Sequence, residues 1–242
     1  MKNNTVVAML FVIGFSVIYG SCGTVFPIKG NGNLATLERS FSSFEKIQID
    51  GSATVRFYAS QEYRAVVTVD SNLVDYAEIV TDGSTLKIGT KDFGNALYTN
   101  YTVDVYSPFI TSVSVSGSGR FDGGDDINTS TFAASVSGSS ARFEAIVKCE
   151  TFSVVSRSGK MTVTGNANNA DIKVSGSGST FSGGGFAINS ANVNINGSGK
   201  ATVNVSINLN ANISGSGSTL NYYGDPTNKN INTSGGGKAN GI

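Results

Sequence analysis

Histidine and tryptophan are absent from this chain of 242 residues. Without histidine, the chain has no imidazole base for a nucleophilic triad and no imidazole ligand for a zinc site. Glycosidases use clustered carboxylates instead, and the one acidic cluster is Asp122, Asp125 and Asp126. We therefore expect no enzymatic activity and no cofactor.

Charged residues are also scarce, at 14% of the chain, against about 25% in ordinary globular domains. The 17 basic and 17 acidic residues cancel, so no basic excess points to a nucleic-acid partner. The polar surface must instead come from Ser, Thr, Asn and the 30 Gly residues. These residue types disfavour helix interiors, and the composition therefore favours an all-β protein.

The N-terminal segment has the pattern of an export signal. Lys2 precedes a largely apolar stretch over residues 6–19, which is shorter than the roughly 20 residues of a membrane-spanning helix and typical of a signal peptide. Gly20-Ser21-Cys22 then resembles the bacterial lipobox, although Tyr19 stands where that motif usually has Leu. We expect a signal peptide over 1–21 and lipid attachment at Cys22; the alternative is an ordinary secretory signal followed by an incidental cysteine.

A lipid on Cys22 would hold the protein at the outer membrane, on its surface or its periplasmic face. Residues 22–38 contain the run GTVFPIKGNGN, which is typical of a flexible tether. The second and last cysteine is Cys149. With Cys22 lipidated, it has no disulfide partner in the mature chain, and we expect it to face inward as a small apolar residue.

A repeated corner motif dominates the second half of the chain. The tetrapeptide SGSG, or a close variant, recurs about every 20 residues, and an alternating polar–apolar run precedes each copy. The first Gly of the motif, or its equivalent, is at Gly117, Gly138, Arg157, Gly176, Gly197, Gly215 and Gly235. Alternation of period two indicates strands with one buried face.

A period near 20 residues is too short for a strand–helix–strand unit, which needs about 30. It fits one coil of a solenoid that is stable only when neighbouring coils stack. We therefore predict a right-handed parallel β-helix with regular repeats over 111–242. The alternative is an antiparallel meander or sandwich, whose strands also recur at short intervals.

A second period of about 40 residues lies within the first. Arg120, Lys160, Lys200 and Lys238 follow every other corner, and Ser140, Ser179 and Ser218 follow the corners between them. We expect the four basic residues to form a stripe in alternate coils of one face, with Phe181 in the interior. The stripe is either spaced, solubilising charge or a binding surface for anionic glycans or lipid A-like groups.

The turn that contains Asp122, Asp125 and Asp126 is glycine-rich. Three carboxylates on such a turn could hold Ca²⁺, although their spacing does not match a known calcium loop. The simpler interpretation is a solvated turn.

Residues 39–110 contain alternating strand-like segments that are less repetitive, and we expect them to form irregular coils at one end of a single body spanning 39–242. Three patterns resemble the bacterial head GIN domain family, which is described as auto-transporter adhesins. They are Phe41-x-x-Phe44-x-x-Ile47-x-Ile49-x-Gly51, the run from Pro108 into Val113 to Gly119, and Tyr223-Gly224-Asp225-Pro226. The segment from Asn72-Leu73-Val74-Asp75-Tyr76 through Leu86-Lys87-Ile88 resembles the family as well. The resemblance covers roughly residues 40–242; it implies an envelope β-helix protein and supplies no catalytic residue.

The sequence thus predicts a lipid-anchored envelope protein that serves as a non-catalytic binding or adhesion module. Its partners would be the membrane, through the anchor, and a glycan or another envelope protein. The alternative is a structural or regulatory envelope component that acts through protein–protein contact.

Overall fold

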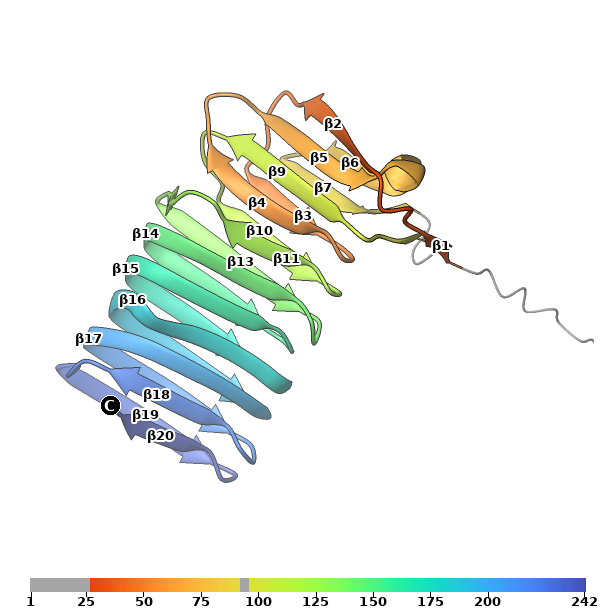
Figure 1. The fold of residues 1–242 in the computed structure, drawn as a ribbon. Coiled ribbons are helices and arrows are strands. Elements are labelled where there is room, and N and C mark those ends of the chain that lie inside the picture. The colour runs from red at the N-terminus through yellow and green to blue at the C-terminus, as the bar shows by residue number, and fades with distance from the viewer. Residues whose placement is uncertain (1–26, 92–95) are drawn as a thin grey trace, which may run out of the picture.

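The computed structural model describes residues 27–91 and 96–242, which fold almost entirely into β-strands (Figure 1). The predicted signal peptide (1–21) and Cys22 lie outside these residues. The one helix among them is the short 3-10 turn η1 (Ser71–Tyr76). In the described ranges, no helix combines the length and the apolar character that crossing a membrane requires.

The regular repeats form the predicted β-solenoid of about six turns. Every strand pairing from β10 to β20 is parallel, so the antiparallel alternative is wrong. The strands are β10 (Ser112–Ser116), β11 (Arg120–Gly123), β12 (Ile127–Asn128), β13 (Thr131–Ser137), β14 (Arg142–Ser156), β15 (Lys160–Val174), β16 (Ser177–Asn196), β17 (Ser198–Ser214), β18 (Thr219–Tyr223), β19 (Asn228–Ser234) and β20 (Lys238–Gly241).

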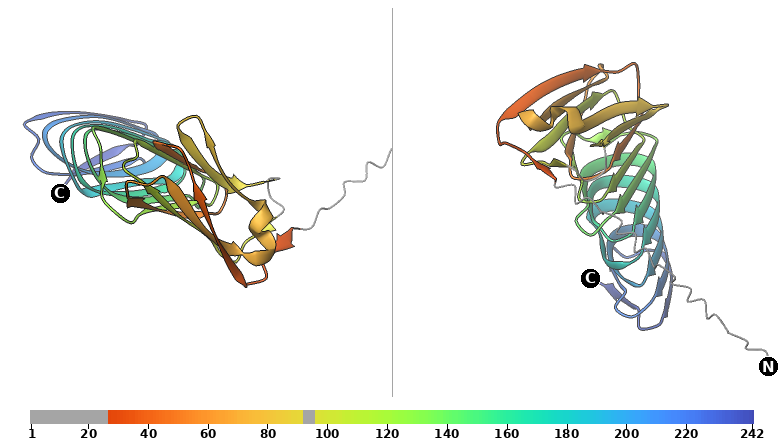
Figure 2. Two further views of the ribbon diagram at one scale, coloured as in Figure 1. Left: turned by 90° about the horizontal axis from the view of Figure 1, so that it is seen from above. Right: turned by 90° about the vertical axis from the view of Figure 1, so that its right-hand side faces the viewer.

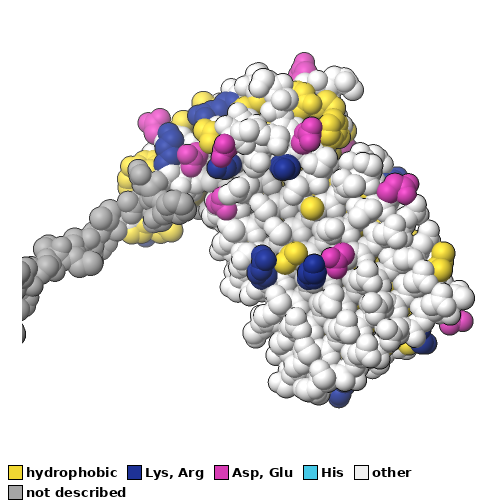
Figure 3. All heavy atoms as spheres, turned by 180° about the vertical axis from the view of Figure 1, so that it is seen from behind, with side chains coloured by type: hydrophobic (Ala, Val, Ile, Leu, Met, Phe, Trp, Pro, Cys, Tyr) yellow, Lys and Arg dark blue, Asp and Glu magenta, His cyan; other side chains and the backbone are white. Residues whose placement is uncertain are grey.

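Each coil has two main faces that meet at the glycine corner, and the coil is flattened in cross-section (Figure 2). We call the strand segments that precede the corners layer A; they include β10, β13, the later parts of β14 to β17, and β19. Layer B follows the corners and contains β11, the first parts of β14 to β17, β18 and β20. On the face drawn in Figure 3, charged side chains are sparse over the coils farthest from the head (residues 27–110).

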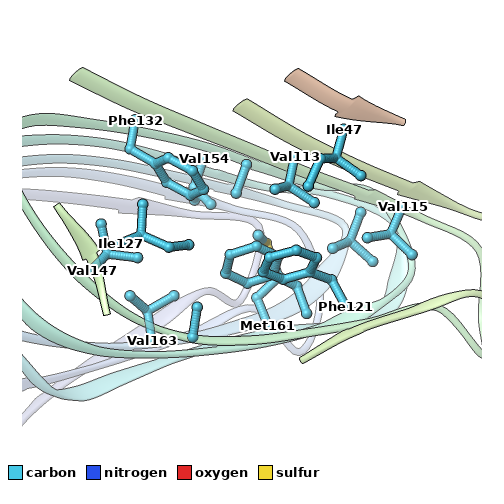
Figure 4. Close-up of a cluster of buried hydrophobic side chains, with 14 of the residues drawn as sticks. Ile47, Val113, Val115, Phe121, Ile127, Phe132, Val147, Val154, Met161 and Val163 are labelled. Carbon is cyan, nitrogen blue, oxygen red and sulfur yellow. The ribbon is translucent and has the colours of Figure 1, made fainter. Parts of the chain in front are cut away.

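The core lies between the two layers. Val113, Phe132 and Val154 reach into it from layer A, and Phe121 and Met161 reach into it from layer B (Figure 4). The layer B residues stack directly from coil to coil, with the Phe121 and Phe143 rings 5.1 Å apart. The full column is Phe121, Phe143, Met161, Phe181, Ala201, Leu220 and Ala239. The predicted interior position of Phe181 is confirmed, since its side chain is fully buried.

The corners alternate in length, which explains the 40-residue period. Between equivalent layer A and layer B positions, the longer corners have five residues and the shorter ones three or four, as the strand registers show. The longer corners are 137–141, 175–179 and 214–218; the shorter ones are 116–119, 157–159, 196–199 and 234–237.

The last residue of each corner explains whether the corner is of the longer or the shorter kind. The longer corners end in Ala141, Ser179 and Ser218, whose side chains are buried. The shorter corners end in Gly, where a Cβ would collide with a core methyl group; at Gly199 it would lie 2.7 Å from Val174 Cγ1. Ser179 and Ser218 are therefore internal corner residues, and the predicted alternation of basic residues with these serines along the exposed stripe is wrong.

The N-terminal part, which we call the head (residues 27–110), closes one end of the solenoid. Antiparallel pairing joins β2 to β5, β5 to β9 and β6 to β7. Its strands are β1 (Ile28–Lys29), β2 (Leu34–Ser40), β3 (Lys46–Ile49), β4 (Thr54–Ala59), β5 (Arg64–Asp70), β6 (Ala77–Asp82), β7 (Thr85–Thr90), β8 (Ala96–Leu97) and β9 (Tyr101–Ser107).

The head joins the repeats without a break. β3 pairs in parallel with β10, and β4 pairs in parallel with β11. These two strands therefore form a first coil around the corner at Gly51, and β7 and β9 add a further layer of parallel strands above it. The prediction of irregular early coils is confirmed for these four strands, whereas β2, β5 and β6 form an antiparallel cap.

The predicted tether over 22–38 is wrong for residues 28–38, which belong to the head. β1 pairs with β8, and β2 pairs with β5 along its whole length. The turn between β1 and β2 is fixed by the buried Asp70 carboxylate, which accepts hydrogen bonds from the Gly32 N–H at 2.9 Å and the Thr99 N–H at 2.7 Å. We call this arrangement the Asp70 clasp.

The hydrogen bonds of the clasp also determine the protonation state of the Asp70 carboxyl group. The Thr99 hydroxyl donates to Asp70 Oδ1 at 2.5 Å, and together with the N–H groups of Thr99, Gly32 and Asn100 it lowers the pKa of Asp70 to about 2. Gly30 is required beside it, because a Cβ there would lie 2.2 Å from Asp70 Oδ2. Asp70 is therefore ionised at neutral pH and holds the N-terminal turn.

Candidate binding surfaces

The predicted basic stripe lies on the exposed side of layer B. The strand register aligns Lys160, Thr180, Lys200, Thr219 and Lys238 in one column. The three lysines therefore occupy alternate coils, with threonines between them. All three are exposed, and no ion pair involves them within the described residues.

The alternation fails at the head end of the stripe. Arg142 stands opposite both Arg120 and Lys160, so three cations occupy consecutive coils. The corner before Arg142 has five residues, and this extra residue moves Arg142 into the column in place of Ser140. Glu144 offsets the repulsion by pairing with Arg120 at 3.3 Å.

The carboxylates of the acidic turn have separate partners. Asp122 pairs with Arg120 at 3.4 Å, Asp126 pairs with Lys148 at 2.7 Å, and Asp125 accepts a hydrogen bond from the Ala59 N–H at 3.0 Å. Among residues 27–91 and 96–242, no three Asp, Glu, His or Cys residues are grouped as metal ligands would be. The structure thus does not bring the three carboxylates together. Asp125 joins the turn after β11 to β4 of the head, Asp126 joins the same turn to β14, and Asp122 pairs within β11.

An ordered field of asparagines, which the sequence analysis missed, covers the exposed side of layer A. We call it the asparagine face. It consists of three rows of four residues on adjacent coils: Ser190, Asn192, Asn194 and Asn196; Asn208, Asn210, Asn212 and Ser214; and Asn228, Asn230, Asn232 and Ser234. In the first two rows, the alternate residues are buried in the core: Ala191, Val193, Ile195, Leu209, Ala211 and Ile213. The sequence signal that could have revealed this face is the N-x-N-x-N pattern, which recurs at 192–196, 208–212 and 228–232.

Side-chain hydrogen bonds connect the rows into ladders along the solenoid axis. The Asn210 amide donates to Asn192 Oδ1 at 3.3 Å, and Asn230 donates to Asn210 Oδ1 at 3.3 Å. The neighbouring ladder runs from Asn228 to Asn208 at 2.8 Å and on to Ser190 Oγ at 2.9 Å. Each bond is donated by the later coil to the earlier one.

The asparagine face is hollowed between its first two ladders. Two adjoining hollows, of about 250 and 410 Å³, share Asn208 and Asn210 as lining residues. The first extends toward the head past Asn169 and Asp171, and the second extends past Asn228 and Asn230. Together they form a shallow groove that crosses successive coils.

A larger pocket of about 690 Å³ lies where the head meets the first corners. Its wall combines apolar Ile88, Ala96 and Leu97 with charged Asp50, Glu78 and Lys87. Asp50 Oδ1 accepts a hydrogen bond from Ser116 Oγ at 2.7 Å, and Lys87 pairs with Asp82 at 2.5 Å. This pocket could not be predicted from the sequence, because its residues come from head strands and corners that are far apart in the chain.

Cys149 faces inward, as predicted, with 8% of its surface exposed. Burial raises the pKa of its thiol to about 11, so the thiolate that nucleophilic chemistry needs is not formed at neutral pH.

Comparison with solved structures identifies the same architecture in other bacterial proteins. A "putative adhesin" from Bacteroides fragilis matches with a TM-score of 0.78 and 19% identity, over 89% of this chain and 100% of that one. A "putative lipid binding protein" from Parabacteroides distasonis matches with a TM-score of 0.72 and 26% identity, over 89% and 99%. A "putative adhesin" from Parabacteroides merdae matches with a TM-score of 0.68 and 24% identity, over 90% and 99%.

A search of curated proteins gave no match. The family model described as "Putative auto-transporter adhesin, head GIN domain" matches residues 43–226, which include the first coil and all but the last strands of the repeats. The region agrees with the resemblance seen in the sequence. This chain therefore belongs to the head GIN domain family of adhesin-like proteins.

Proposed function

We propose that this protein is a non-catalytic binding or adhesion module that a lipid on Cys22 attaches to the outer membrane. The observation that carries the proposal is the solenoid itself, whose two exposed layers present the same polar side chains at one position in coil after coil. A repeated, rigid surface of this kind suits extended or polymeric ligands. The adhesin descriptions of the family and of two structural relatives agree with this role.

The Asp70 clasp supports an anchor close to the head. Cys22 is five residues before Pro27, and a fully extended chain spans at most about 3.3–3.6 Å per residue. The head would then stay within about 20 Å of the lipid, and the last coils would project away from the membrane.

Several features support a non-catalytic role. The chain has no histidine, the Cys149 thiol is buried, and each carboxylate of the acidic turn is bound to a protein group. These side chains stabilise the fold, and none is left poised for proton transfer.

The basic column of Arg120, Lys160, Lys200 and Lys238 is our proposed contact for anionic groups of glycans. Lys160, Lys200 and Lys238 carry exposed charge, whereas Arg120 shares its charge with Asp122 and Glu144. Binding through exposed lysines would weaken steeply as salt is added.

The anchor is tested by expressing Cys22→Ser. The variant should move from the membrane fraction to the soluble fraction, with Cys149→Ser as the matched control that stays with the membrane. If Cys22→Ser remains in detergent-extracted membranes like the unaltered protein, the lipid anchor is excluded. Protease added to intact cells then separates a surface position from a periplasmic one.

A structural or regulatory role in the envelope is the alternative. The head pocket supports it, because a mixed apolar and charged concavity of about 690 Å³ could also receive a protein segment. Cross-linking in intact cells followed by purification would separate the two: one envelope protein recovered in equal amount favours the alternative, and recovery of polysaccharide favours adhesion.

A further inference from the structure

We infer that the groove between the first two ladders of the asparagine face binds a neutral, extended polysaccharide, which lies along the solenoid axis. This inference rests on the proposed binding function and assigns it a second surface, separate from the lysine column. The groove is in layer A, and the lysines are in layer B, on the other side of the core.

The ladder hydrogen bonds leave one free donor and one free acceptor on each central amide. An asparagine side chain has two N–H donors and an oxygen with two lone pairs. Asn210 donates one N–H to Asn192 and accepts one from Asn230, so its second N–H and second lone pair remain available to a ligand. Asn208 is in the same state, since it donates to Ser190 and accepts from Asn228.

The free groups match carbohydrate hydroxyls, each of which can both donate and accept. The ladders also fix the amide rotamers before a ligand arrives, which removes part of the entropy cost of binding. The match repeats from coil to coil with the strand spacing of about 4.8 Å, a length comparable to one sugar unit in an extended chain. A polymer can therefore make the same contacts several times.

Charge distinguishes this ligand from the others that a flat β surface could bind. The three rows contain only Asn and Ser, and the charged residues that line the hollows, Asp171 and Lys229, lie at opposite ends of the groove. Nucleic acid and anionic glycans need a run of cations, which the groove lacks. The rows also lack the large apolar and aromatic side chains on which protein interfaces depend.

The test uses the full chain carrying Cys22→Ser, run in native gels that contain carob galactomannan, konjac glucomannan or tamarind xyloglucan. We expect at least one of these neutral polymers to retard the protein, and the retardation should not change when salt is added. The double variant Asn208→Ala/Asn210→Ala should weaken retardation about tenfold, which corresponds to the loss of one or two uncharged hydrogen bonds.

The matched control is Asn194→Ala/Asn212→Ala, which removes the neighbouring ladder of the same face. That ladder has the same hydrogen bonding, with Asn212 donating to Asn194 at 3.4 Å, but it does not line the groove. The control should lose thermal stability as the groove variant does and should keep its retardation. Equal weakening in both variants would mean that the ladders only stabilise the coils, and that outcome overturns the inference.

A second set of outcomes separates this inference from the proposed function. If no neutral polymer retards the protein but alginate does so in a salt-sensitive way, the groove assignment is wrong and adhesion through the lysine column stands. If neither class of polymer binds and cross-linking recovers one envelope protein, both proposals fail together.

Discussion

Residues 39–110 contain 15 charged side chains among 72 residues, whereas residues 111–242 contain 16 among 132. The difference follows from how strands meet in the two regions. In the repeats, each residue lies beside its counterpart in the next coil, so a repeated charge would face a like charge about 4.8 Å away. In the head, antiparallel pairing brings unlike residues together; Arg64, for example, pairs with Glu38 at 3.3 Å.

The two regions also differ in the kind of interaction that stabilises them. The head relies on single, unrepeated interactions such as the Asp70 clasp, whereas the repeats rely on identical contacts made many times. Loss of one head interaction should therefore act locally and depend on its own chemistry. Loss of one core residue in the repeats should interrupt a column that all coils share.

The largest expected effect is in the shared column. Phe181→Ala should lower the free energy of unfolding by about 3–5 kcal/mol, because it leaves a cavity between Met161 and Ala201. Urea unfolding followed by far-ultraviolet circular dichroism would measure it. Phe181→Leu, which keeps most of the volume, is the control and should lose much less; a loss below about 1 kcal/mol for the alanine variant would contradict a stacked core.

A shorter corner should resist even one added methyl group. Gly199→Ala places a Cβ 2.7 Å from Val174 Cγ1, and we expect overpacking to cost about 1–3 kcal/mol. Combining it with Val174→Ala should remove the collision, so that the double variant is more stable than the sum of the two single losses predicts. Strictly additive losses in a double-mutant cycle would show that the corner type is not set by this contact.

The Asp70 clasp should make the stability of the head depend on pH. In the folded protein, the pKa of Asp70 is lowered to about 2, from about 3.9 in an unfolded chain. The stabilisation is therefore complete above about pH 4–5 and is lost as the pH falls through about 2. Asp70→Asn should remove that contribution, and protease cleavage near residues 29–33 should then be as fast at neutral pH as in acid. A difference between the two proteins that persists unchanged from pH 7 to pH 2 would contradict this assignment.

The smallest expected effect concerns the charge spacing. Thr180→Lys would place a cation between Lys160 and Lys200 in adjacent coils, at a cost of roughly 0.2–1 kcal/mol for each new pair. The loss should largely disappear near 1 M salt, where the screening length is about 3 Å. Thr180→Gln is the uncharged control. A loss that is insensitive to salt would indicate a packing effect.

Much of the repeat architecture could be predicted because the signal was repeated. The corner motif, the alternating strand and the apolar position that Phe181 occupies each recur about every 20 residues. A single copy that departs from the motif therefore does not hide the pattern. The predicted places of Ser140 and Ser179 are wrong because the corners differ in length, and the strand register that reveals this is formed only when coils stack.

The head was harder to predict because its interactions occur once. Asp70 accepts hydrogen bonds from Gly32 and Thr99, which lie 38 and 29 residues away along the chain. No local sequence pattern predicts such a contact. β2 is an edge strand with most of its residues exposed, so it lacks the apolar alternation that marks a strand. The asparagine face had a visible sequence pattern, but its meaning depended on which coils become neighbours.

The alternation of corner length sets the unit by which such a protein can change size during evolution. Removing one coil would bring two corners of the same length together. Two adjacent longer corners would place two internal side chains in the same space, and two adjacent shorter corners would leave the interior beside their glycines unfilled. Duplication or deletion of two coils, about 40 residues, preserves every neighbour relation. Because the antiparallel head closes one end, such pairs of coils are added or lost within the repeats, and the reach of the surface changes in fixed steps while the anchored end stays the same.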